Sequence, residues 1–183
     1  MMNFPIISSL ILLPSIGALF LFFINSKNIN GIKYVSLFVS IINFLISIYL
    51  WLIFDQSSYE FQFVESRVWI KDFINYKVGV DGISILFIIL TTFITPLCIL
   101  SVNSSIKNRL KEFLIAILLM ETLMIGVFCS LDLVIFYLFF EGGLIPMFLI
   151  IGIWGGERRV YSAFKFFLFT LCLLYTSPSP RDQ

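Results

Sequence analysis

Apolar runs about as long as a lipid bilayer is thick recur along the chain, and they constrain its fold more than any other feature. Hydrophobic residues make up 60% of the 183 residues and charged residues only 13%, and the mean hydropathy is +1.03. A soluble domain cannot bury so much apolar surface, so lipid is the expected solvent of this chain. A helix needs roughly 20 apolar residues to cross the hydrocarbon core. Five such spans are predicted, over residues 4–24, 34–54, 83–102, 113–130 and 133–154, with a partial sixth over 161–171.

The same runs determine the secondary structure, because lipid offers no hydrogen-bonding partner to a free backbone group. Each run is about twice as long as a strand of a membrane barrel, so every span is expected to be a helix. Neither a signal-peptide cleavage site nor an Arg/Ser-rich transit peptide accompanies the first run, which is therefore expected to be a retained span. The predicted fold class is an all-α polytopic membrane protein, with a transmembrane helical region over residues 1–171.

The distribution of Lys and Arg predicts which side of the membrane each loop faces. By the positive-inside rule, the loops after the first, third and fifth spans lie in the cytoplasm or matrix, and the N-terminus lies on the other side. These loops carry Lys27, Lys33, Lys107, Arg109, Lys111, Arg158 and Arg159. The extramembrane loop 55–80 faces the opposite side, where acidic residues dilute its basic ones. Its alternating stretch FQFVESRVWI indicates either a short β-hairpin or an interfacial helix, without a catalytic signature.

Charge and cysteine usage exclude several classes of protein. The net charge is +1 and the chain has no basic tract, which argues against nucleic acid as a partner. Histidine is absent, and the three cysteines have neither disulfide spacing nor metal-ligand spacing. No zinc or haem site is therefore expected.

Three ionisable residues fall inside predicted spans: Glu121, Glu141 and Lys165. A carboxylate at the bilayer centre costs about 2.5–3.5 kcal/mol on insertion scales, so such residues usually line a polar path or meet a partner. At about 1.5 Å of helical rise per residue, Glu121 lies roughly 12 Å from the inner end of its span and Glu141 roughly 13 Å from the outer end of its own. In a core about 30 Å thick, the two acids are expected at similar depth.

The helical neighbours of Glu141 offer it no charged partner. The residues three and four positions away are Tyr137, Leu138, Leu144 and Ile145. Any compensating group must come from another helix, another subunit or water. A carboxyl tuned between the effects of burial and of a nearby cation can take and release a proton near neutral pH, as a proton relay requires. The alternative, for Glu121 as well, is a neutral carboxyl that is hydrogen-bonded within the packing.

Lys165 allows two interpretations. It lies about 6–10 Å from the inner interface, so its side chain either joins a buried path or extends to water. A depth difference of roughly 10 Å from Glu141 does not favour direct pairing. Asp132 and Asp81 are predicted to cap the starts of the fifth and third spans, where free N–H groups favour a carboxylate.

Gly142, Gly143 and Pro146 follow Glu141 within five residues. Pro146 removes a backbone donor and is expected to bend the helix near residue 142, while the two glycines allow another helix to approach closely. Such a stretch either makes room for water or a partner beside the acid, or serves ordinary helix packing.

Two runs of sequence also resemble a known family. They are LDLVIFYLFFEGGLIPMFLIIGIWGGERRVYSAFKFFLFT, residues 131–170, and GVDGISILFIILTTFITPLCIL, residues 79–100. The acid, the LIPMF that follows it and the WG(x)₂RR loop resemble subunit four of respiratory NADH dehydrogenase (complex I), called NuoM in bacteria. The resemblance implies the N-terminal part of a fourteen-helix antiporter-like fold, with two inverted repeats that form half-channels for proton translocation. Subunits of Mrp-type cation/proton antiporters are relatives, and a non-transporting membrane scaffold is the alternative of another class.

The resemblance also implies roles for the buried charges. Glu141 matches the essential glutamate of the family's fifth helix, Glu121 an acidic position of the fourth, and Lys165 a lysine at the start of the sixth. In the family the fifth-helix glutamate pairs with a lysine on helix seven, which lies outside this chain. No flavin, iron–sulfur cluster or NADH site is expected here, since other subunits of the complex use NADH and ubiquinone. The implied partners are other membrane-arm subunits and the bilayer, in the mitochondrial inner membrane or a bacterial plasma membrane.

Residues 172–183, CLLYTSPSPRDQ, depart from the family pattern, which continues with apolar helix. The stretch resembles the translation of a tagmentation adapter from a sequencing library. Residues 172–183 are therefore expected to be a non-native tail.

Overall fold

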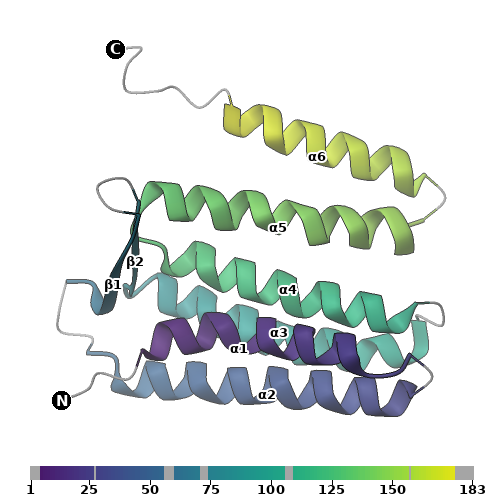
Figure 1. Ribbon diagram of the computed structural model, residues 1–183, viewed down its shortest axis with the longest axis horizontal. Coiled ribbons are helices and arrows are strands. Elements are labelled where there is room, and N and C mark those ends of the chain that lie inside the picture. Colours follow the sequence, from purple (N-terminus) through teal and green to yellow (C-terminus); the bar gives the residue numbers. More distant parts are fainter. Residues whose placement is uncertain are drawn as a thin grey trace.

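The computed structural model describes residues 5–26, 28–55, 60–70, 74–105, 109–156 and 158–175. Within them the chain forms a helical bundle with one antiparallel hairpin (Figure 1). The elements are α1 (Ile6–Phe23), α2 (Ile29–Ile53), β1 (Gln62–Ile70), β2 (Ile74–Val80), α3 (Ser84–Ser105), α4 (Leu110–Cys129), α5 (Leu133–Trp154) and α6 (Arg159–Tyr175).

Helices α1 to α5 are each long and apolar enough to cross a membrane. Helix α6 is shorter, with 17 residues. The predicted fold class is therefore confirmed: a polytopic helical protein with five full spans and a partial sixth. Helix α4 packs against α1, α2, α3 and α5, whereas α6 packs against the outer side of α5 (Figure 1).

Helix α2 begins five residues before the predicted start of its span. The reason is a local cap, since the side-chain oxygen of Asn28 accepts from the backbone N–H of Gly31 at 3.1 Å. Lys33, expected in a loop, therefore lies in the first turns of α2. In the same way Lys111 and Arg159 lie in the first turns of α4 and α6 rather than in loops.

The predicted caps of α3 and α5 are confirmed. The Asp132 carboxylate accepts from the N–H groups of Val134 and Ile135 at 2.8 and 3.3 Å, and α5 begins at Leu133. The Asp81 carboxylate accepts from the N–H of Ser84, the first residue of α3, at 2.6 Å. Both interactions are local, which is why the sequence pattern alone predicts them.

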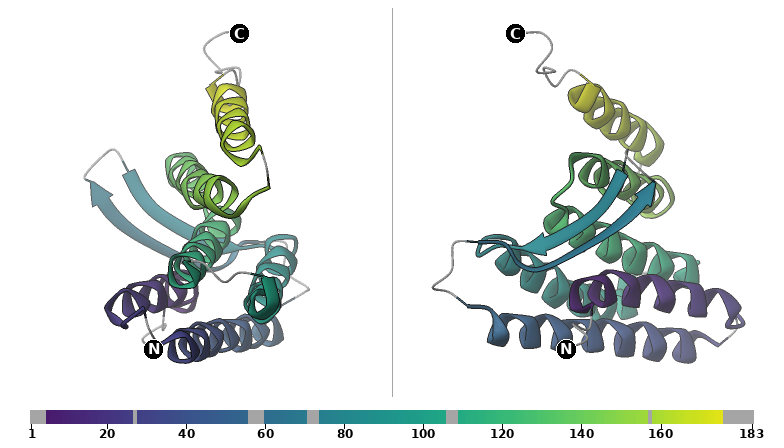
Figure 2. Two further views of the ribbon diagram at one scale, coloured as in Figure 1. Left: turned by 90° about the vertical axis from the view of Figure 1, so that its right-hand side faces the viewer. Right: turned by 60° about the vertical axis from the view of Figure 1, so that its left-hand side comes forward.

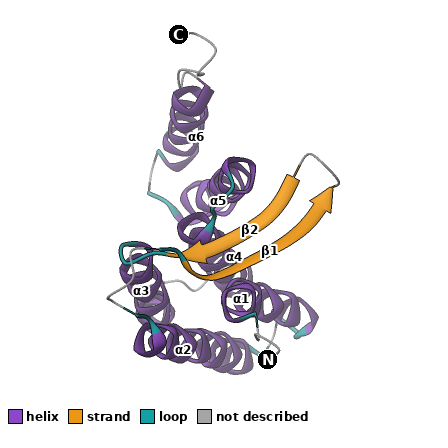
Figure 3. Ribbon diagram, turned by 90° about the vertical axis from the view of Figure 1, so that its left-hand side faces the viewer, coloured by secondary structure: helices purple, strands orange, loops and turns teal. Residues whose placement is uncertain are grey.

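The segment between α2 and α3 forms a hairpin, the first of the two alternatives. Strands β1 and β2 pair antiparallel and lie across one end of the bundle (Figures 2 and 3). Val78 of β2 also bridges to Ser130, and the N–H of Leu131 donates to the Lys77 carbonyl at 3.0 Å. The hairpin is thus joined to the turn between α4 and α5.

Distant side chains close both ends of α1. At its start, the Glu65 carboxylate of β1 accepts from the N–H groups of Ile7 and Ser8 at 2.9 and 3.2 Å, and from the Ser8 hydroxyl. At its end, the Lys111 ammonium donates to the carbonyls of Phe22 and Ile24 at 2.9 and 2.7 Å. A carboxylate at the N-terminus and a cation at the C-terminus are the charges that a helix dipole favours.

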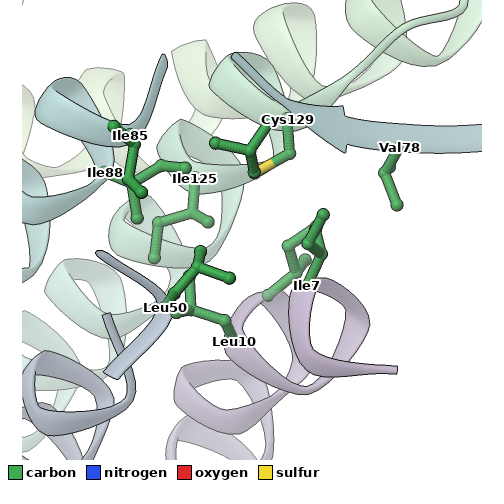
Figure 4. Packing of buried hydrophobic residues seen from close by; sticks show 10 residues of the cluster. Ile7, Leu10, Leu50, Val78, Ile85, Ile88, Ile125 and Cys129 are labelled. Atoms are coloured by element: carbon green, nitrogen blue, oxygen red, sulfur yellow. The ribbon is translucent and has the colours of Figure 1, made fainter. Parts of the chain in front are cut away.

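Two apolar clusters fill the bundle, one near each end. The cluster beneath the hairpin joins α1, α2, α3, α4 and β2 (Figure 4), through Ile7, Leu10, Ile11, Leu50, Val78, Val80, Ile85, Ile88, Ile125 and Cys129. The other joins α1 to α4 through Ala18, Leu21, Ile32, Ile99, Val102, Leu110, Leu114 and Leu118. The residues between them on each helix include polar ones, so the apolar packing is interrupted at mid-bundle.

Candidate functional site

A layer of polar side chains crosses the bundle between the two apolar clusters. This mid-bundle polar layer is contributed by all four helices α1 to α4. Its members are Ser15, Ser40, Asn43, Ser47, Thr92, Thr95, Glu121 and Thr122. Apart from the half-buried Ser15, all of these side chains are buried. Because buried polar groups in lipid need partners, such a layer is expected to be linked by hydrogen bonds between helices.

Hydroxyl groups make two of these links. The Ser15 hydroxyl of α1 donates to the Thr122 hydroxyl of α4 at 3.0 Å, and the hydroxyls of Ser47 and Thr92 join α2 to α3 at 2.8 Å. Thr122 and Thr92 also donate to carbonyls of their own helices, at 3.1 and 3.0 Å. These four hydroxyls are therefore satisfied within the protein.

Glu121 is the acid at the centre of the layer, and only 2% of it is exposed. Its Oε1 accepts from Nδ2 of Asn43 on α2 at 2.8 Å. The other oxygen of each group, Oε2 of Glu121 and Oδ1 of Asn43, is buried and has no hydrogen-bond partner among the described residues. Glu121 is thus the most deeply buried of the three predicted relay residues.

A cavity of about 270 Å³ lies between α3 and α4, and Glu121 forms part of its wall. Thr91, Thr95 and Cys98 line the α3 side of this cavity. Cys98 is exposed, so the cavity lies at the outer surface of the bundle rather than between the two apolar clusters. The cavity thus brings the wall formed by Glu121 close to the outer surface of the bundle.

Glu141 lies at the same depth as Glu121 but in other surroundings. Eight positions separate Glu121 from the end of α4 at Cys129, and eight separate Glu141 from the start of α5 at Leu133, or about 12 Å in each case. Glu141 is half-buried, and within the described part of the chain no side chain hydrogen-bonds or ion-pairs with it. Glu121 turns toward α2 instead of α5, so the structure does not pair the two acids.

The glycines beside Glu141 lie where α5 packs against α4. A Cβ atom on Gly142 would lie 3.2 Å from Cδ2 of Leu123, and one on Gly143 would lie 3.9 Å from Cβ of Leu123. This contact supports the packing interpretation. Helix α5 continues through the buried Pro146, whose missing N–H leaves the carbonyl of Gly142 without its usual donor.

Lys165 lies apart from both acids. Its side chain is exposed on α6, and its ammonium lies 5.9 Å from the centre of the Tyr161 ring, one turn toward the start of the helix. The structure therefore does not bring Glu121, Glu141 and Lys165 together within this part of the fold.

Asn43 is the site residue that sequence reasoning missed. The signal is a polar stripe in the second span, since Ser36, Ser40, Asn43 and Ser47 recur at intervals of four, three and four residues. This spacing places them on one helix face, and all four are fully buried. A polar stripe in an otherwise apolar span indicates a contact with another polar helix.

Comparisons with known proteins agree with the resemblance. Residues 130–173 match the family model described as NADH:quinone oxidoreductase/Mrp antiporter, TM. The chain is 50% identical over 167 residues to NADH-ubiquinone oxidoreductase chain 4 of Arabidopsis thaliana, covering 90% of this chain and 34% of the relative. It is 59% identical over 138 residues to NADH-quinone oxidoreductase subunit M of Rhodobacter capsulatus, covering 75% of this chain and 27% of the relative.

A third relative is NADH-quinone oxidoreductase subunit M of Rickettsia prowazekii (strain Madrid E), which is 47% identical over 174 residues, covering 93% of this chain and 35% of the relative. The chain thus spans about a third of the length of the curated relatives it matches. It belongs to the family of antiporter-like membrane subunits of NADH:quinone oxidoreductases, in the group of chain 4 and subunit M proteins.

Proposed function

We propose that this chain is part of a core membrane subunit of a respiratory NADH:ubiquinone oxidoreductase, which couples electron transfer to proton translocation. The observation that carries the proposal is the pair of acids held at one depth of a lipid-embedded bundle, in a chain of this family. An acid at mid-membrane is retained against a cost of about 2.5–3.5 kcal/mol, which is characteristic of residues on an ion or proton path.

Glu141 is the proposed relay group, with Glu121 and Lys165 as further members of the path. The half-buried Glu141 side chain and the free carbonyl of Gly142 support this role, because both can bind water or a side chain from a further helix. The lysine that would pair with Glu141 is proposed to come from a segment outside this chain.

The redox reaction is proposed to occur elsewhere in the complex. Among the described residues, no three side chains of His, Cys, Asp or Glu lie close enough to hold a metal ion. The chain is proposed to bind no cofactor of its own and to contact other membrane-arm subunits and lipid. The oxidation of NADH by ubiquinone in the other subunits is proposed to supply the energy for proton translocation. The proposed location is the mitochondrial inner membrane, with a bacterial plasma membrane as the alternative. The abundance of Phe and Ile, whose codons are AT-rich, supports an organelle genome.

Replacing Glu141 by Gln in the full-length subunit tests the relay. Glutamine keeps the size of the side chain but cannot carry a proton, so pumping by the assembled complex is expected to fall to background. Proton uptake by vesicles on NADH addition measures this, and the amount of intact complex is measured alongside it. The matched control is Glu112→Gln on α4, where the acid is 54% exposed and pairs with Arg109 at 3.5 Å.

The outcomes separate the alternatives. Normal pumping by the Glu141→Gln complex would contradict the relay and favour a scaffold role for the acid. An Mrp-type cation/proton antiporter subunit is the other alternative, because the family model covers both groups. Transport that depends on sodium and not on NADH would favour it.

A further inference from the structure

Two unsatisfied atoms in the polar layer belong to the same hydrogen-bonded pair. Oε2 of Glu121 and Oδ1 of Asn43 are both buried without a partner among the described residues, although the other ends of these two groups are joined at 2.8 Å. Both orphan atoms are oxygens, which accept hydrogen bonds. The pair therefore lacks a donor.

An ionised Glu121 would be poorly compensated at this position. Burying a carboxylate without a cation or several donors is strongly unfavourable, and leaving the amide oxygen unpaired adds to the cost. Helices α1 and α3 carry no charged residue, and the titratable group that α3 adds to the cavity wall is Cys98. The sole charge of α2 is Lys33, ten positions or about 15 Å before Asn43.

The remaining neighbours of α4 do not supply a cation at this depth either. The sole charge of α5 is Glu141, which is acidic, and β2 carries Lys77 at the end of the bundle. On α4 itself Lys111 lies at the start of the helix, where it is bound to carbonyls of α1. A single proton on Glu121 supplies the missing hydrogen-bond donor and leaves the carboxyl neutral, so no cation is needed.

We propose that Glu121 and Asn43 form a neutral acid–amide pair that stores one proton between α2 and α4. The Glu121 carboxyl is protonated on Oε2 and donates to Oδ1 of Asn43, while Nδ2 of Asn43 donates to Oε1. One proton then gives both Oε2 of Glu121 and Oδ1 of Asn43 a hydrogen bond. The two side chains are joined by a ring of two hydrogen bonds between α2 and α4. Asn43 is the positioning residue of this pair, because it holds the proton on the acid without reacting itself.

The pair concerns the protonation of this chain's own carboxyl, so it stands independently of the proposed function. Release of the proton would leave three buried acceptor positions and one donor. A donor from outside the pair would then have to reach Glu121, and the cavity between α3 and α4, whose wall includes this residue, adjoins it.

Infrared spectroscopy of the full chain in lipid nanodiscs tests the pair. At neutral pH the wild-type protein is expected to show the carbonyl band of a protonated carboxyl, which Glu121→Gln removes. Asn43→Leu is expected to shift this band to higher frequency, because the carbonyl loses its donor. The matched control is Ser40→Ala, since Ser40 lies on the same buried stripe and its hydroxyl bonds to the Leu37 carbonyl of its own helix at 2.9 Å.

A merely structural role for Asn43 would leave the band unmoved, and a wild-type spectrum in which Glu121→Gln removes only carboxylate absorption would overturn the proposal. Should Asn43→Leu fail to fold, a carbodiimide reaction on the wild-type chain decides instead. Dicyclohexylcarbodiimide takes the acid's proton onto nitrogen and adds its carbon to the carboxylate oxygen, so it labels protonated acids in apolar surroundings. Labelling of Glu121 at neutral pH, detected by peptide mass spectrometry, is expected, and labelling only in acid would overturn the proposal.

Discussion

Glu121 and Glu141 lie at the same depth, but one neighbouring residue, Asn43, makes their surroundings different. Asn43 donates a hydrogen bond to one carboxyl oxygen of Glu121, whereas no described side chain hydrogen-bonds or ion-pairs with Glu141. The position of Asp81 or Asp132 relative to its helix can be read from spacing, because a cap acts within three residues. The Asn43 contact spans 78 residues and depends on how α2 is rotated relative to α4, so the sequence pattern gives the stripe but not its partner.

Gly126 on α4 shows how closely the helices that carry the two acids approach each other. A Cβ at this position would lie 2.5 Å from the ring of Phe139 on α5. Gly126→Ala is therefore expected to destabilise the protein by about 1–3 kcal/mol, the usual cost of overpacking. Thermal unfolding in detergent measures the change.

The control for this substitution is Gly82→Ala, where nothing lies within 4 Å of the added atom. Combining Gly126→Ala with Phe139→Ala should cost less than the sum of the two single changes, since the ring that causes the clash is removed. Full additivity would show that the contact is not the source of the loss.

At the scale of elements, α1 depends on the hairpin. Pro5 precedes the helix and provides no side-chain cap, and the Glu65 carboxylate takes that role from β1. Glu65→Ala is expected to weaken the start of α1 by about 0.5–2 kcal/mol, as the loss of an N-cap does. Faster hydrogen exchange at the amides of Ile7 and Ser8 would report this.

Ser66→Ala is the matched control, because Ser66 is the exposed next residue of the strand and pairs through its backbone with Lys77. Exchange at Ile7 that is unaffected by Glu65→Ala would show that another group caps the helix.

The start of α3 is expected to depend on pH. The Ser84 hydroxyl, and after it the Ser84 backbone N–H, donate to Asp81 and hold the pKa of this carboxyl below its ordinary value of 3.8. Because the folded pKa is the lower one, the stabilisation is fully present above about pH 4 and is lost as the pH falls through the folded value. Hydrogen exchange at Ser84 between neutral pH and pH 2 follows the loss, after correction for the intrinsic rate.

Asp81→Asn is the control for this effect, since an amide still caps the helix but does not titrate in this range. The variant should exchange at a corrected rate that does not change with pH. A variant that keeps the acid-induced loss would assign it to another carboxyl.

Helix boundaries were predicted correctly from the apolar run where the capping residue lies directly at the end of that run, as Asp132 does before α5. Helix α5 has the expected bounds of Leu133 and Trp154, whereas α2 starts earlier because Asn28 adds a cap inside what reads as a polar loop. The hairpin could be predicted only as one of two alternatives. The hairpin also bridges through Val78 to Ser130, a contact between segments that no local pattern brings together.

At the scale of the whole molecule, the helices alternate in direction, so the turns after α1, α3 and α5 lie at one end and the hairpin at the other (Figure 1). The basic residues of those three turns predict that their end faces the cytoplasm or matrix. The sequence predicts this alternation well, because it needs only the number of spans. It does not predict the polar layer, which requires four helices to be rotated correctly at once.

Cysteine labelling tests the orientation. In a chain whose Cys98, Cys129 and Cys172 are changed to Ser, Ser26→Cys is expected to react with an impermeant maleimide only in inside-out vesicles. Gly82→Cys, in the exposed turn before α3, should react only in right-side-out vesicles. The reverse pattern would contradict the predicted orientation, and the two positions act as each other's control.

The two long-range caps of α1 have a consequence for the order in which the protein is made. Glu65 follows Ile7 by 58 residues and Lys111 follows Ile24 by 87. The first helix is therefore synthesised before either closing residue. Until Glu65 is added, the free N–H groups at the start of this helix must be hydrated or held by the insertion machinery. The carbonyls at its end need the same until Lys111 is added at the start of the fourth helix. Closure of the first helix is therefore completed only after the start of the fourth has been made.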